Sequence, residues 1–94
     1  MKIRFLREPG TNIAHIESHG VSEQEAHEVF ANPIEDGQAK NGARAIIGRT
    51  RGGRIVRLVY VNDPEPESVF VITGMPVRQK ALKALRRRMR RRMK

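Results

Sequence analysis

A glycine pair between two strand-like runs constrains the fold of this chain more than any other feature. Residues 43–50 and 54–61 are rich in aliphatic and β-branched side chains and flank Gly52 and Gly53. Glycine adopts the positive φ angles that a two-residue hairpin turn requires, so the two runs are predicted to pair as antiparallel strands. The chain is therefore expected to fold around a β-hairpin.

A two-residue turn fixes which residues share a face of that hairpin. One face is predicted to be apolar and to pack against helices; it carries Ala45, Ile47, Val56, Leu58 and Tyr60. The other face carries Arg44 and Arg57, and Gly48 opposite Arg57 leaves space beside its guanidinium. Such a pocket can hold a phosphate and stabilise its charge during strand cleavage. The alternative is that both arginines are ordinary exposed strand residues.

The segment before the hairpin contains one strand and two helix signals. Residues 2–6 alternate as a short strand, and residues 12–19 fit a short helix that stops at Gly20. Ser22 followed by Glu25 forms a capping box, which predicts the start of a second helix.

After the second helix, residues 35–42 are expected to form a loop with a ragged edge strand, and residues 69–73 a central third strand. Residues 77–94 are predicted to form a basic C-terminal helix. The order predicts one α+β domain over residues 1–94, with an antiparallel sheet of three to four strands, two N-terminal helices and the basic helix.

Charge is distributed very unevenly along the chain. The net charge is +9, yet residues 1–76 carry nine Lys and Arg against ten Asp and Glu. Residues 77–94 carry ten basic residues and no acidic one. So dense a cationic segment repels itself unless a polyanion neutralises it, which favours a nucleic acid as partner.

An apolar stripe from Leu82 to Met93 is expected to dock the basic helix on the domain and leave its cations to phosphates. The candidate nucleic-acid-binding residues are Arg78, Lys83, Arg86, Arg87, Arg90 and Arg91. Two alternatives remain: a solvated, frayed tail, or an amphipathic helix that meets a membrane surface or an acidic protein.

Two further side chains are candidates for chemistry. His15 and His19 lie one helical turn apart, but no cysteine or obvious carboxylate completes a metal site. His15 or His19 can transfer a proton, or both are ordinary histidines on the polar face of a helix; His15 is kept as the candidate for chemistry. Tyr60 is the only tyrosine and is expected to be packed with its hydroxyl at the rim. Neither a cofactor nor a metal is predicted. With no export signal and no membrane-spanning stretch, a cytoplasmic protein is expected.

Several short motifs resemble the BrnT-type toxins of bacterial toxin–antitoxin pairs. They are His19-Gly-Val-Ser-Glu-Gln-Glu-Ala, Val29-Phe30, Arg44 with Ile-Ile-Gly48, Val59-Tyr60 and Val71-Ile72-Thr73. The resemblance implies a RelE-like fold, metal-independent endoribonuclease activity and a cognate antitoxin protein as partner. It departs at Phe70 and Met75, where the family typically has arginines.

Three hypotheses follow for the function. The first is a toxin that cleaves RNA, either free or on the ribosome, with Arg44, Arg57, His15 and Tyr60 as candidate catalytic residues. The second is a nucleic-acid-binding domain without catalysis, and the third is a domain whose basic helix binds an acidic protein. A homodimer is left open, and no membrane partner is expected.

Overall fold

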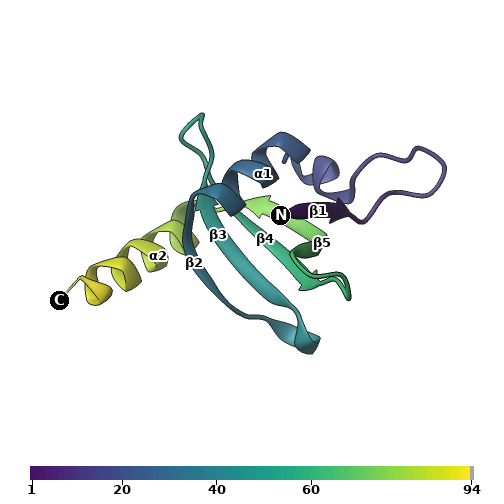
Figure 1. The fold of residues 1–94 in the computed structure, drawn as a ribbon. Coiled ribbons are helices and arrows are strands. Elements are labelled where there is room, and N and C mark those ends of the chain that lie inside the picture. Colours follow the sequence, from purple (N-terminus) through teal and green to yellow (C-terminus); the bar gives the residue numbers. More distant parts are fainter. Residues whose placement is uncertain (94) are drawn as a thin grey trace.

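The glycine pair does produce a hairpin, between β3 (Arg44–Arg49) and β4 (Ile55–Asn62) (Figure 1). The structure is a computed structural model that describes residues 1–93. The loop has three residues, because the backbone N–H of Thr50 donates to the carbonyl oxygen of Arg54 at 2.9 Å. Within the loop only Gly53 has a positive φ, of 88°. Three-residue loops that end in a left-handed residue are a common alternative to the two-residue turn.

The longer loop shifts the register by one residue and overturns the predicted faces of β3. Arg57 lies opposite Ile47, and Gly48 lies opposite Val56. Side chains alternate along a strand, so a one-residue shift turns every β3 side chain to the other face. Arg44 and Arg57 therefore lie on opposite faces of the sheet, and the prediction of a shared phosphate pocket is wrong.

The sheet has five strands in the order β1-β5-β4-β3-β2, with β1 (Lys2–Phe5), β2 (Pro33–Gln38) and β5 (Ser68–Pro76) added to the hairpin. β1 and β5 run parallel, and the other pairs are antiparallel. The predicted antiparallel sheet of three to four strands is therefore wrong. The strand expected over residues 2–6 does form as β1, but its parallel pairing with β5 was not predicted. The full edge strand β2 was expected to be mostly loop, and it is followed by a short 3₁₀ turn, η2 (Lys40–Gly42).

Only one of the two predicted N-terminal helices is an α-helix, α1 (Glu23–Ala31). Residues 12–19 contain just a 3₁₀ turn, η1 (His15–His19). Asn12 has a φ of 60°, a left-handed conformation that an α-helix does not contain. The predicted stop at Gly20 and the Ser22 capping box of α1 are both confirmed.

The first face of the sheet, defined by Val56, Leu58 and Tyr60, carries the main core. α1 and η1 cover it, and Ile16 and Val29 are almost completely buried there. The helix approaches so closely that a Cβ on Gly48 would lie 2.7 Å from the Val29 carbonyl oxygen. Gly48 is thus part of the helix packing and not an open space beside an arginine.

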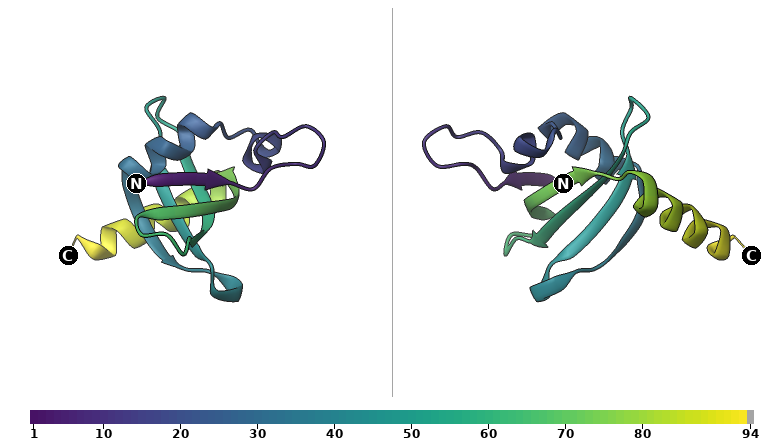
Figure 2. Two further views of the ribbon diagram at one scale, coloured as in Figure 1. Left: turned by 45° about the vertical axis from the view of Figure 1, so that its right-hand side comes forward. Right: turned by 180° about the vertical axis from the view of Figure 1, so that it is seen from behind.

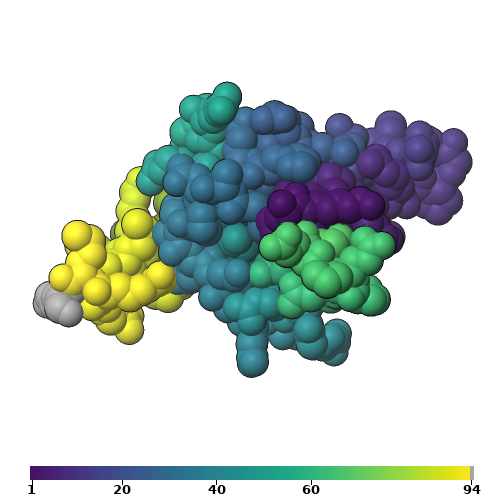
Figure 3. All heavy atoms as spheres, viewed as in Figure 1, coloured from purple at the N-terminus to yellow at the C-terminus, as the bar shows by residue number. Residues whose placement is uncertain are grey.

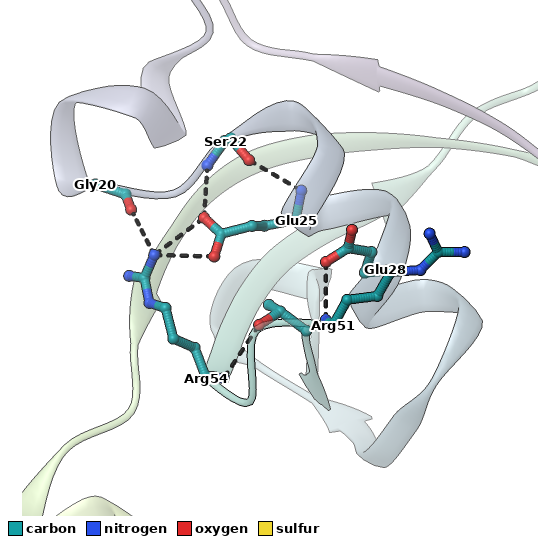
Figure 4. A network of polar contacts seen from close by, with 7 residues as sticks. Gly20, Ser22, Glu25, Glu28, Arg51 and Arg54 are labelled. Carbon is teal, nitrogen blue, oxygen red and sulfur yellow. Dashed lines mark hydrogen bonds and ion pairs between the residues drawn. The ribbon is translucent and has the colours of Figure 1, made fainter.

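The hairpin loop is also attached to α1 by polar contacts (Figure 4). Arg54 Nη1 donates to both carboxylate oxygens of Glu25, at 3.0 and 2.9 Å, and to the Gly20 carbonyl oxygen at 3.1 Å. The Arg51 backbone N–H donates to Glu28 at 3.0 Å. Glu25 also closes the capping box with Ser22, so one carboxylate holds both the helix start and the loop.

The second face of the sheet is only partly covered. α2 (Gln79–Arg92) crosses one end of it, while the rest of the strands carry no helix there (Figure 2). The end of α2 extends past the strands as a projection (Figure 3), which contributes to principal extents of 46 × 27 × 25 Å.

We predict that Gly48→Ala destabilises the protein by about 1–3 kcal/mol, because the added methyl group overlaps backbone atoms of α1. Gly37→Ala is the matched control, since a Cβ there meets nothing within 4 Å. The free energy of unfolding from urea titration measures both effects. Equal stabilities of the two variants would contradict the close approach of α1 to β3.

Candidate nucleic-acid interface

The basic segment folds as the ordered helix α2, anchored by its apolar stripe. Leu82, Leu85 and Met89 recur at steps of three and four, and Leu85 is only 1% exposed. The stripe was predicted to remain docked to Met93, but this residue is 86% exposed. The apolar stripe therefore packs on the sheet as far as Met89 and leaves Met93 uncovered.

Glu35 on β2 holds the C-terminal half of α2 through two arginines. Arg88 Nε and Nη2 donate to the two Glu35 carboxylate oxygens at 2.8 and 2.9 Å. Arg92 also pairs with Glu35 and donates to the Ile34 carbonyl oxygen at 3.2 Å. Hydrogen bonding to Arg88 keeps the pKa of Glu35 below its usual value. These two arginines position the helix and are only partly available to a ligand.

The other cations of α2 and the residue before it point to solvent. Within residues 1–93 none of them forms an ion pair, and all are exposed; we call Arg78, Lys80, Lys83, Arg86, Arg87, Arg90 and Arg91 the outward cations. The six predicted nucleic-acid-binding residues all belong to this set. Like charges four residues apart, such as Arg87 and Arg91, cost about 0.2–0.5 kcal/mol per pair in an isolated helix. A bound polyanion removes that repulsion.

The uncovered part of the second face forms a half-buried surface beside α2. This open face consists of Arg4, Ala45, Arg57, Val59, Val61, Phe70, Thr73 and Met75. The Arg4 guanidinium lies 5.3 Å from the centre of the Phe70 ring, a cation–π arrangement. Arg57 is half-buried and has no carboxylate partner in the part of the chain that the structure describes. No sequence pattern points to Arg4, because β1 joins this face only through its pairing with β5, which is distant in the chain.

Arg44 and Tyr60, two of the four predicted catalytic residues, meet on the first face. Asp36 accepts hydrogen bonds from the Tyr60 hydroxyl at 2.8 Å and from Arg44 Nε at 3.2 Å. The Tyr60 ring packs edge-on against Phe30 and is 5% exposed, as expected for a packed aromatic residue. Burial, followed by the bond to Asp36, raises the pKa of Tyr60. Tyr60 therefore stays protonated at neutral pH and serves as a hydrogen-bond donor.

The other two predicted catalytic residues lie elsewhere. His15 Nδ1 is 2.5 Å from a Glu8 carboxylate oxygen, and its ring packs edge-on against His19 at 5.1 Å. This histidine cluster sits on η1, whereas Arg57 lies on the open face of the sheet. The structure thus does not bring the four residues together as one site.

Neither a cluster of metal ligands nor a membrane-spanning helix is found within residues 1–93. No three histidine or carboxylate side chains in this range come together to hold a metal ion. No helix in the same range has both the length and the apolar character to cross a membrane.

Comparison with models of protein families, with curated proteins and with solved structures gives no significant match. What the surface around α2 can bind follows from its own geometry and charge. That geometry combines exposed, unpaired cations with an adjacent half-buried sheet face.

We predict that Glu35→Gln lowers stability at neutral pH by about 1 kcal/mol, in line with partly exposed ion pairs. The pKa of Glu35 is lower in the folded state than in the unfolded state, where it is near 4.5. The Glu35 charge therefore contributes fully to the free energy of unfolding above the unfolded-state pKa, and this contribution is lost as the pH falls through the folded-state pKa. The difference in unfolding free energy between wild type and variant should therefore shrink in acid. Urea titrations between neutral pH and about pH 3 measure it, with Glu65→Gln as an exposed control. A difference that is independent of pH would contradict the role of the Glu35 charge.

Proposed function

We propose that this protein binds single-stranded RNA, with the outward cations of α2 holding phosphates and the open face of the sheet accepting bases. The observation that carries the proposal is the ordered helix with seven exposed cations that find no carboxylate within residues 1–93. Arginine guanidinium groups match phosphate oxygens in bidentate geometry. Each neutralised phosphate releases counterions, so affinity should fall steeply as salt rises.

A single strand is favoured over a duplex because of what the open face of the sheet offers. Phe70 and the Arg4 guanidinium above it offer flat π and cationic surfaces on which unpaired bases stack. Arg57 adds a positive charge to the same face. A duplex presents its phosphates to α2 but keeps its bases stacked internally, so it leaves the open face unused. The proposal places the protein in the cytoplasm.

We predict that Arg87→Ala and Arg88→Ala, neighbours in the chain, have different effects. Arg87 is an outward cation, so its loss should reduce the slope of log affinity against log salt by about 0.7 and leave stability unchanged. Arg88 is bonded to Glu35, so its loss should lower stability by about 1 kcal/mol with a smaller change in slope. Fluorescence anisotropy of a labelled RNA oligonucleotide over a potassium chloride series measures the slopes. A wild-type affinity that does not depend on salt would refute phosphate binding by α2.

A ribonuclease toxin of the kind that the BrnT resemblance implies is a second candidate. The supporting observation is Arg57, whose half-buried guanidinium has no carboxylate partner in the described chain. Such a group can stabilise the charge that builds up on a phosphate during attack by the neighbouring 2′-hydroxyl. Arg44 is less able to stabilise charge on a phosphate, because Asp36 already pairs with its guanidinium.

We predict for this candidate that induced expression arrests bacterial growth and degrades RNA, and that Arg57→Ala lowers cleavage by about 10²-fold. Arg51→Ala, at the exposed tip of the hairpin loop, is the matched control and should leave cleavage unchanged. Growth curves and RNA integrity after induction provide the measurement. Intact RNA and normal growth with the wild-type protein would eliminate the toxin while leaving RNA binding to be judged by the salt series.

A further inference from the structure

A second surface of α2 faces away from the open face and toward the hairpin loop. There the helix and the ends of the strands enclose a groove of about 560 Å³. Its floor is apolar and consists of Ile55, Leu82, Leu85 and Met89. The exposed arginines Arg49 and Arg86 lie at its sides. The residues that line the groove include no acidic side chain.

The apolar floor continues along α2 beyond the body of the protein. Leu82 and Met89 are half-buried in the groove, and Met93 lies one helical turn after Met89 on the same side. Met93 is 86% exposed because the last turn projects past the strands (Figure 3). From Leu82 to Met93 the stripe is about 16 Å long, enough for three turns of a second helix.

Charge and apolar character together specify what can cover this stripe. Phosphates would pair with Arg78 and Arg86, which line the groove, but would leave Leu82, Met89 and Met93 without apolar partners. A basic or neutral helix would fill the groove but would bring no countercharge to the arginines. An acidic amphipathic helix supplies both the apolar partners and the countercharge, because its apolar side chains lie on the stripe and its carboxylates pair with the arginines at the edges.

We propose that the groove and the stripe from Leu82 to Met93 form a docking site for an acidic amphipathic helix of a partner protein. This site lies on the side of α2 toward the hairpin loop, whereas Lys83, Arg87 and Arg91 remain exposed for phosphates. The proposal does not depend on RNA binding, since it rests on apolar side chains that RNA does not use.

A designed peptide tests the proposal on the full-length protein. The probe is a fluorescent 18-residue helix with leucines at steps of three and four on one side and glutamates on the rest; its control has the same composition in scrambled order. We expect the striped peptide to bind at least about tenfold more tightly than the scrambled one. Equal binding of the two peptides would mean attraction by charge alone and would overturn the proposal.

Variants of α2 locate the contact. Met93→Ser removes an exposed part of the stripe without changing the fold and should lower the affinity for the striped peptide several-fold. Arg86→Glu should lower this affinity more than Lys83→Glu, because Lys83 lies on the outward side of the helix. Thermal melting verifies that each variant is folded. Unchanged peptide binding by Met93→Ser, or equal losses for Arg86→Glu and Lys83→Glu, would refute the docking site. If Met93→Ser weakened an RNA oligonucleotide and not the peptide, RNA would be the occupant and the proposal would be wrong.

Discussion

The register of the β3–β4 hairpin determines which side chains of this protein can act together. Because the loop contains three residues, Gly48 faces α1 and lets the helix pack directly on the strand, and Arg44 turns to the same first face, where Asp36 and Tyr60 hold it. Arg57 remains on the second face with the open surface and α2. The third residue of the hairpin loop thus places Arg44 in a structural contact and leaves Arg57 available to a ligand on the other face.

The arginines of α2 have two roles, and pairing with the Glu35 carboxylate determines which of them hold the helix in place and which remain available to a ligand. Glu35 engages Arg88 and Arg92 and so sets the rotation of the helix about its axis. With that rotation fixed, Leu85 points to the sheet, and the remaining cations are divided between solvent and the edge of the groove. Phosphate binding on one side and docking of an acidic helix on the other are compatible with this single orientation.

Several local signals predicted the structure correctly, although the helix expected over residues 12–19 is only a 3₁₀ turn. The Ser22 capping box, the stop at Gly20 and the hairpin itself follow from nearby side chains and backbone preferences. The loop length was not predictable from two glycines, because only one of them takes a positive φ. The parallel pairing of β1 with β5 has no local signal at all, and the open face with Arg4 depends on it. The sequence also did not predict which arginines of α2 form ion pairs. They pair with Glu35, which lies in a segment that was expected to be mostly loop.

The pairing of Lys2 with Ser68 and of Phe5 with Val71 also has a consequence during synthesis. The first strand leaves the ribosome long before its neighbour in the sheet, so it waits unpaired until β5 has also emerged. Only then can Phe5 close the core, because its partner Val71 belongs to that later strand.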